Sequence, residues 1–383
     1  MRRFGLTRTL SFLFAYFVVY SQTFAQVQSV SGEVQQALDY EKQGAFLSAE
    51  ESWKQITIAS PQNADAWAHL GLVRALEGKY PDAVAAYRKA GELHSQLPGL
   101  QIDLGLALFK QQKFKDAIPA LQAAVEESPK DVKPKLLLAM SYYGSAQYAE
   151  AIPYLKFAVS SSPDNLQLRM TLAQSCLWAE QYSCTLEQYQ EILRLNPQSA
   201  QADMLAGEAS DGLNQTVEAI KLFQEAEKVS PHEPEVHFGL GYLLWKEHRF
   251  EEAETEFKLE LEDNPNQAQA LTYLGDIAIR HNDEDTALNY LQRAVAQPQA
   301  IRLAYLDLGI VDADHKRNED ALVNFQRAID MDPAQVDAHY RLGRLYVSMG
   351  KPKEAQAEFA KTNDLQRKVR ETLAQKMAPV TSK

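Results

Sequence analysis

Prolines recur along this chain at one fixed interval or at twice that interval, and this period constrains the fold more than any other feature of the sequence. They stand at Pro61, Pro129, Pro163, Pro197, Pro231, Pro265 and Pro333. A fixed period of about 34 residues is typical of a repeat architecture, in which one supersecondary unit is stacked many times. Placing each proline at position 32 of its repeat gives ten repeats of equal length, from Val30 to Val369, without insertion or deletion.

Three positions carry the same kind of side chain in nearly every repeat. Position 8 is glycine or alanine, position 20 is alanine with one exception, and position 24 is large and apolar. Examples are Gly71 and Gly309 at position 8, Ala83 and Ala321 at position 20, and Tyr87 and Phe325 at position 24. Small residues let two helix axes approach closely, and the large residue fills the space that remains. The pattern therefore predicts pairs of packed helices.

The pattern resembles the tetratricopeptide repeat (TPR) family. Two stretches match its signature closely: Trp67-Ala68-His69-Leu70-Gly71 with Ala83, Tyr87 and Ala90, and Tyr305 with Leu308-Gly309, Ala321, Phe325, Ala328 and Pro333. The resemblance implies an all-α, right-handed superhelical solenoid of stacked antiparallel helix hairpins, with a concave groove lined by the first helix of each hairpin. The first repeat departs from it at Glu33 and Gln36, the fifth at Thr185, and the last at Arg367.

The register divides the chain into five segments. We expect a signal peptide over 1–25, a degenerate amino-terminal capping repeat over 26–63, and nine full repeats over 64–369. Leu365, Val369, Leu373 and Met377 fall on one helical stripe, which predicts a carboxy-terminal capping helix over 365–378 that covers the last hairpin and overlaps the last repeat. Residues 379–383 form a tail.

Residues 1–25 have the pattern of a secretory leader. Arg2, Arg3 and Arg8 precede an apolar run, and Thr23-Phe24-Ala25 offers small residues where a signal peptidase cleaves. The run of roughly a dozen residues is shorter than the ~20 that span a bilayer as a helix, so cleavage after Ala25 is favoured over an uncleaved anchor. We expect an exported protein, periplasmic or extracellular, without a membrane span after cleavage.

Charge argues against a polyanionic partner. The 39 Lys and Arg against 51 Asp and Glu give a net charge of -12, which repels nucleic acid and anionic lipid. We therefore expect a protein or peptide partner and no nucleic acid. The sequence does not give the oligomeric state.

The resemblance also assigns groove positions, which are positions 2, 5, 9, 12 and 13 of each repeat. Apolar residues at these positions predict a partner-binding groove, unless their side chains are used up in packing between adjacent first helices. They are Leu72, Leu106, Phe109, Met140, Tyr143, Trp178, Phe238, Tyr242 and Trp245.

Acidic residues concentrate in repeats six to eight, since Ala200 to Ile301 holds 20 acidic and 7 basic residues, a balance of 7 - 20 = -13. Glu208, Asp211 and Asp276 take groove positions there. Either they attract Lys or Arg of a partner or they are a solvated face.

No catalytic constellation is found in the sequence, so we expect no enzyme activity and no cofactor. The eight histidines are scattered over separate repeats. His237 and His248 would need nearby acids to hold a metal, and solvated surface histidines are far commoner, so no metal site is expected.

Cys176 and Cys184 are the only cysteines and stand almost symmetrically about the turn of the fifth hairpin. In an exported protein they form a disulfide if their Cα atoms lie within about 7 Å. The other interpretation is two buried free thiols that act as small apolar fillers.

These features favour a non-enzymatic protein–protein interaction scaffold that binds partner segments in its groove. The alternative is an accessory or regulatory subunit of a cell-envelope polysaccharide or cell-wall enzyme complex.

Overall fold

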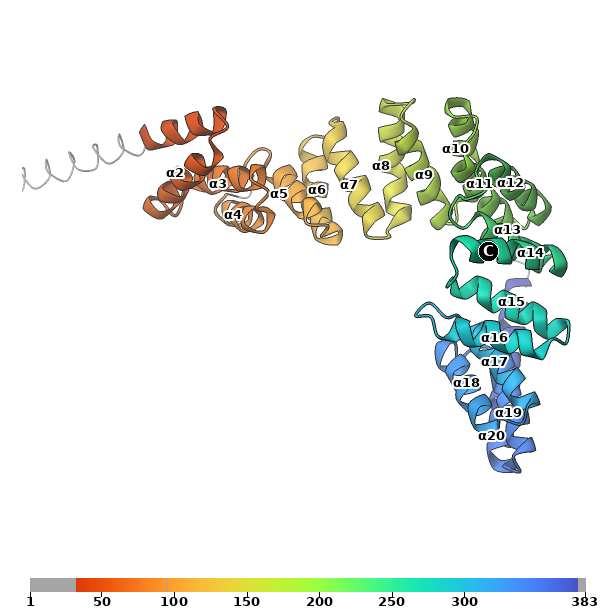
Figure 1. Ribbon diagram of the computed structural model, residues 1–383. Helices are drawn as coiled ribbons and strands as arrows, with labels where there is room; N and C mark the ends of the chain where they lie inside the picture. The colour runs from red at the N-terminus through yellow and green to blue at the C-terminus, as the bar shows by residue number, and fades with distance from the viewer. Residues whose placement is uncertain (1–31, 95, 378–383) are drawn as a thin grey trace, which may run out of the picture. The chain divides into compact units, whose positions relative to one another are not determined.

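A computed structural model of the chain describes residues 32–94 and 96–377, and these form helices and no strand (Figure 1). The signal peptide predicted for 1–25 and the tail predicted for 379–383 lie outside the described residues. The prediction of an all-α fold built from antiparallel helix hairpins is confirmed for the described residues. None of their helices combines the length and apolar character that crossing a membrane requires.

A helix over residues 32–42 comes first and is followed by nineteen labelled helices. Those up to the middle of the chain are α2 (Phe46–Ala59), α3 (Ala64–Leu76), α4 (Tyr80–Leu93), α5 (Leu100–Lys110), α6 (Phe114–Glu127), α7 (Val132–Gly144), α8 (Tyr148–Ser161), α9 (Leu166–Trp178) and α10 (Tyr182–Leu195). The remainder are α11 (Ala200–Gly212), α12 (Thr216–Val229), α13 (Val236–Lys246), α14 (Phe250–Asp263), α15 (Ala268–Arg280), α16 (Glu284–Val295), α17 (Arg302–Asp314), α18 (Asn318–Met331), α19 (Val336–Ser348) and α20 (Pro352–Met377).

The period of the sequence is also the period of the helices. Each second helix of a hairpin, from α2 to α20, begins exactly one repeat length after the previous one. From α3 to α19, the first helices begin at position 1 of their repeats except α5 and α13, which begin two residues later. Those two follow Pro98-Gly99 and Pro234-Glu235, and both Gly99 and Glu235 have a positive φ that no helix accommodates.

The small residue at position 8 and the large one at position 24 pack directly on each other. A Cβ built on Gly71 would lie 2.6 Å from the ring of Tyr87, and one on Gly309 would lie 2.7 Å from the ring of Phe325. Both rings are buried. Since Cβ atoms do not approach other carbons so closely, a larger residue than glycine in these two hairpins would push the ring or the helices apart.

The chain divides into two compact units, one ending at Gln188 and the other beginning at Tyr189. We call them the N-terminal and C-terminal units. First helices pack on one another within each: α3 on α5 and α5 on α7 in the N-terminal unit, and α13, α15, α17 and α19 in succession in the C-terminal unit. Each unit thus presents a layer of first helices backed by second helices.

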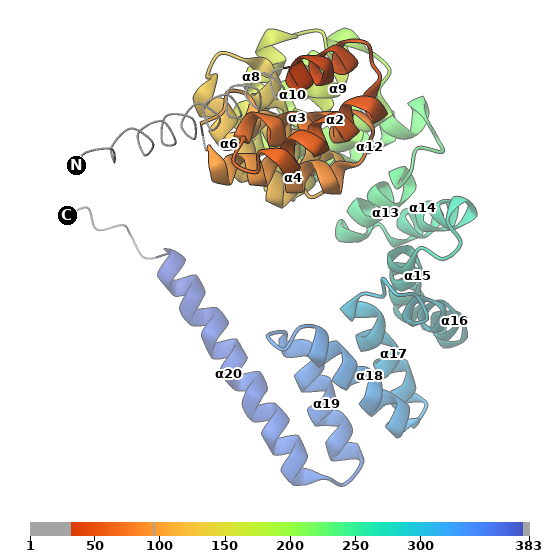
Figure 2. The same ribbon diagram turned by 90° about the vertical axis from the view of Figure 1, so that its left-hand side faces the viewer.

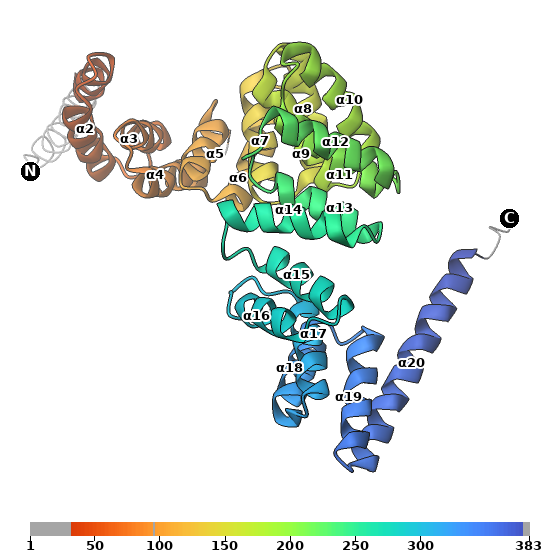
Figure 3. The same cartoon turned by 45° about the vertical axis from the view of Figure 1, so that its right-hand side comes forward.

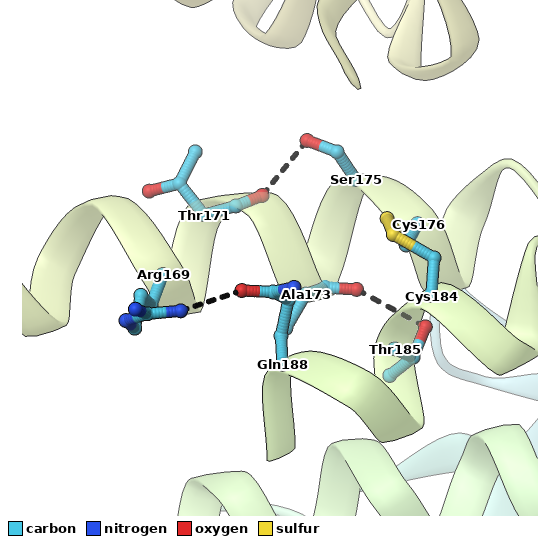
Figure 4. The surroundings of a disulfide bond; sticks show 8 residues. All are labelled: Arg169, Thr171, Ala173, Ser175, Cys176, Cys184, Thr185 and Gln188. Atoms are coloured by element: carbon cyan, nitrogen blue, oxygen red, sulfur yellow. Dashed lines mark hydrogen bonds between the residues drawn. A yellow bond between two sulfur atoms is a disulfide. The ribbon is translucent and has the colours of Figure 1, made fainter. Parts of the chain in front are cut away.

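A disulfide joins Cys176 of α9 to Cys184 of α10, and their Cα atoms are 5.7 Å apart (Figure 4). It closes the one hairpin whose position 20 is not alanine. Thr185 stands there, fully buried, and its hydroxyl donates to the carbonyl of Ala173 at 3.3 Å. The disulfide therefore ties the two helices together where the packing pattern departs from the other repeats.

Reducing this disulfide should lower the free energy of unfolding by about 2 to 3 kcal/mol, because the link restricts the unfolded chain. Urea unfolding with and without dithiothreitol measures the difference. A Cys184→Ser variant is the control, since its unfolding should not respond to the reductant. Equal midpoints for the oxidised and reduced wild-type chain would contradict the expectation.

The capping helix expected over 365–378 is the end of a longer helix in the described residues. Residues up to Met377 continue α20, which runs past the end of α19 (Figures 2 and 3). Val369, expected to cover the hairpin, is 52% exposed. Arg367 stands at a position that proline occupies in seven of the nine earlier repeats, so no proline interrupts the helix at this point.

Candidate functional site

The predicted apolar groove residues of the N-terminal unit all lie on first helices. Their side chains are partly exposed, and Trp178 is the most open at 46%. They are Leu72 on α3, Leu106 and Phe109 on α5, Met140 and Tyr143 on α7, and Trp178 on α9. Met140 and Tyr143 also pack against buried core residues, so packing between first helices uses part of their surface and leaves part accessible.

Trp178 lies at the centre of an aromatic cluster. Its ring stacks on Tyr143 with centroids 5.9 Å apart and meets Tyr148 of α8 at 4.6 Å. The Tyr143 hydroxyl donates to the side-chain oxygen of Gln174. Tyr148 was not predicted, because it begins a second helix, yet it holds the Trp178 ring in place. We call Tyr143, Tyr148 and Trp178 the Trp178 cluster.

A second aromatic cluster lies on α13 and α15 of the C-terminal unit. Tyr242 stacks on Phe238 at 6.5 Å and on Trp245 at 6.3 Å between centroids. Tyr273 of α15 contacts all three, most closely Trp245 at 4.9 Å. Burial raises the pKa of Tyr273 to about 12, so its hydroxyl stays neutral. We call these four residues the Tyr242 cluster.

Tyr273 was missed because it occupies position 6, which the family pattern does not assign to the groove. The sequence did offer one signal: Tyr273 is aromatic and lies on α15, the first helix of the hairpin that follows the one with the aromatic residues of α13. Since α13 and α15 are packed neighbours, an aromatic residue there is well placed to meet Tyr242.

Asp276 does not have the role expected for it. Asp276 is 7% exposed, and its Oδ2 accepts hydrogen bonds from Trp245 Nε1 and Arg280 Nε, both at 2.7 Å. A carboxylate engaged in this way holds the Trp245 ring in the Tyr242 cluster and is not available to a partner's cation. The prediction of an acid open to a partner is therefore wrong for Asp276, because Arg280, four residues later on the same helix face, already pairs with it.

Asp211 and Glu208 differ from each other. Asp211 Oδ1 accepts from Lys246 Nζ at 2.7 Å, so this acid also has a cation within its own unit. Glu208 stays exposed. The surrounding protein and the charge of Glu235 raise its pKa. Of the three predicted groove acids, Glu208 is the one best placed to accept a cation from outside.

Asp307, on α17, is a buried acid that the sequence analysis did not single out. It is 5% exposed, and its Oδ2 has no hydrogen-bond partner among the described residues. Burial, and next the charge of Asp276, raise its pKa well above the ordinary value, while Arg280, Arg302 and Arg341 offset part of this. A solvent-inaccessible aspartate of this kind costs stability when it ionises.

Asp307→Asn should therefore stabilise the chain by about 1 kcal/mol at pH 7. The raised pKa means that Asp307 holds its proton to higher pH in the folded state than in the unfolded state, so the contribution of Asp307 to stability falls as pH rises above about 4. The gain from asparagine should shrink as pH falls toward 4. Urea midpoints of both proteins between pH 4 and 8 measure this, and a gain that is constant with pH would contradict it.

The histidines considered as metal ligands are not brought together. His248 lies in the turn before α14, with its ring against Phe250. His237, on α13, is buried, and its Nδ1 lies 2.7 Å from Glu256 Oε2.

Two of the hollows on the described surface have volumes of about 320 and 470 Å³. They are lined mainly by turns and second helices, such as Phe114 in one and Val323 in the other. None of the predicted groove residues lines either hollow. The aromatic clusters lie on the first helices, and a helix surface suits an extended or helical partner segment.

Comparison with protein families gives matches along the chain. One model described as tetratricopeptide repeat matches residues 108–152, 142–209, 212–272 and 313–376, which is more than half of the chain. A second model with the same description matches residues 34–98 and 186–234.

Among individual proteins, anaphase-promoting complex subunit 3 of Schizosaccharomyces pombe is 26% identical over 132 residues, 34% of this chain. The chain covers only 20% of that relative's length. The crystal structure of the APC/C hetero-tetramer Cut9-Hcn1 is similar with a TM-score of 0.51 at 15% identity, over 86% of this chain and 72% of that chain. Yeast Tom70 has a TM-score of 0.47 at 16% identity, over 89% and 86%. At 15% identity, the similarity to the Cut9-Hcn1 structure shows a shared fold alone.

Proposed function

Because this chain belongs to the tetratricopeptide repeat family, we propose that it is a non-enzymatic, exported scaffold that binds segments of partner proteins on its layers of first helices. The repeat fold itself supports a role in protein–protein interaction. The observation that carries the finer proposal is the pair of aromatic clusters on these helices, the Trp178 cluster and the Tyr242 cluster.

Aromatic side chains suit this role for a physical reason. They supply large contact area with few rotatable bonds, and they are enriched at the centres of protein interfaces. Neighbouring rings hold Trp178 and Tyr242 in place before a partner arrives, so little conformational entropy is lost on binding. A partner segment bound at either cluster is therefore expected to present apolar side chains to it.

The acidic character of the C-terminal unit adds a preference for basic residues in the partner. Glu208 and Glu235 lie close enough for the charge of one to raise the pKa of the other, and neither forms an ion pair among the described residues. A lysine or arginine of the partner would relieve this repulsion and fix the register of the segment.

Export is proposed on the leader pattern of residues 1–25. The disulfide in the fifth hairpin supports it, since disulfides persist in oxidising compartments. Fractionation of the native cell followed by alkylation without reductant provides the test. A cytoplasmic protein with two alkylated thiols would refute export.

Two substitutions test the scaffold proposal. Trp178→Ala and Tyr242→Ala should each weaken capture of a protein partner from native envelope extracts at least tenfold, as expected for central interface aromatics. Val217→Ala is the control, since Val217 lies on a second helix and is 66% exposed. Partner capture unaffected by both aromatic changes would refute binding on first helices. Glycan retention without any protein partner would favour the accessory subunit of a polysaccharide or cell-wall complex.

A further inference from the structure

Three polar side chains from consecutive helices converge inside the C-terminal unit. Glu227 of α12, His237 of α13 and Glu256 of α14 each offer a ligand atom, and these atoms all lie within 4.8 Å of one another. His237 and Glu256 are largely buried, with side-chain exposures of 8% and 14%. Glu227 is partly exposed, so its side chain retains freedom to adjust.

The pair of His237 and Glu256 has a counterpart elsewhere in the chain. His339 and Glu358 occupy the same positions, 4 and 23, of the tenth repeat, and His339 Nδ1 lies 2.6 Å from Glu358 Oε2. A pair that recurs in this way links the first and second helices of a hairpin, which is a structural role. The pair alone therefore does not indicate a ligand.

The third residue makes the difference between the two places. Position 28 of the preceding repeat is Glu227 beside the first pair and Ile329 beside the second. Both ring nitrogens of His339 have partners, Glu358 and the carbonyl of Pro333, whereas among the described residues the hydrogen-bond partner of His237 is Glu256 alone. Beside His237 and Glu256 there is thus an additional carboxylate, that of Glu227, and a ring nitrogen of His237 without a hydrogen-bond partner among the described residues.

The charges at this place are not balanced by the protein. Neither Glu227 nor Glu256 forms an ion pair with a lysine or arginine in the described part of the chain. Two adjacent carboxylates, one of them nearly buried, therefore lack a lysine or arginine partner.

We propose that Glu227, His237 and Glu256 form a Zn²⁺ site that links the sixth and seventh repeats. One imidazole and two carboxylates are ligands that zinc accepts, at about 2.0 to 2.2 Å from the metal. Ligands of one tetrahedral ion lie about 3.3 Å apart, so a small movement of Glu227 closes the site. The fourth position is filled by water or by a side chain of a partner.

The test uses the full chain without a histidine tag, stripped of metal and titrated with Zn²⁺ against a competing chromophoric chelator. The wild-type chain should bind one equivalent of Zn²⁺ with higher affinity than any further Zn²⁺ that its other histidines bind. Glu227→Ile copies the arrangement at Ile329 and should weaken that binding at least tenfold. Glu225→Ile, an exposed glutamate on the same helix, is the matched control and should bind as the wild type does.

A second measurement separates loss of the site from loss of the fold. Glu227→Gln keeps the size of the side chain and removes its charge, so it should fold as the wild type does by circular dichroism and still bind Zn²⁺ at least tenfold more weakly. Zn²⁺ should also raise the melting temperature of the wild-type chain and not that of Glu227→Gln. Absence of one-equivalent binding in the wild type, or wild-type affinity in both Glu227 variants, would overturn the proposal.

Discussion

Replacing Gly309 with valine should lower the free energy of unfolding by about 3 kcal/mol. A Cβ at this position would lie 2.7 Å from both Cδ1 and Cε1 of Phe325. The Phe325 ring is 1% exposed, so it has no space into which to move. The two helices of the ninth hairpin must then separate, and urea unfolding followed by circular dichroism measures the loss.

Gly91→Ala is the control for this change. Gly91 also lies in a helix, α4, but a Cβ there would meet only Leu100 Cδ2 at an ordinary 3.5 Å. Because alanine favours the helix over glycine by up to about 1 kcal/mol, this variant should be as stable as the wild type or more so. Equal effects of the two substitutions would mean that position 8 does not set the helix spacing.

The second large effect is expected from Phe257→Ala, which should cost about 3 to 5 kcal/mol. Phe257 is fully buried at position 24 of the seventh repeat and stacks on Tyr273 with centroids 5.4 Å apart. Truncation leaves a cavity under the Tyr242 cluster. Partner binding that depends on Tyr242 should weaken with it, because the cluster loses its support.

The loss should be confined to neighbouring hairpins. Each hairpin of a repeat protein packs on its neighbours, so stability is close to a sum of local terms. Amide hydrogen exchange read by mass spectrometry should show faster exchange in α13 to α16 of Phe257→Ala, with α3 to α6 unchanged. Val323→Ala, 63% exposed, is the control and should change neither. Equal acceleration throughout the chain would contradict a fold held by neighbouring contacts.

The fold could be predicted from the sequence because its determinants repeat. Position 8 must be small where position 24 is large, and ten copies of that pairing make the period visible in a single chain. The length of α20 is less visible, since it depends on Arg367 at a position where proline is expected. The turns are a further case: Gln112, Ala146 and Glu180 adopt a positive φ that these residue types rarely choose.

The site was predicted less completely, because side chains that point at one another across repeats leave no pattern along the chain. The aromatic residues at assigned groove positions were found, but Tyr148 and Tyr273, which hold them, were not. Asp276 was read as an open acid, although Trp245 and Arg280 engage it. Partners in successive repeats, such as Trp245 and Asp276, become evident only in three dimensions.

Partner binding on the first helices is the property on which the proposed function most depends. Site-specific photo-crosslinking in the native cell tests it directly, with a benzophenone amino acid at position 178 or 242 and, as controls, at 217 or 323 on second helices. We predict discrete protein adducts from 178 and 242 and none from 217 and 323. Adducts from 217 or 323, with none from 178 or 242, would contradict the claim.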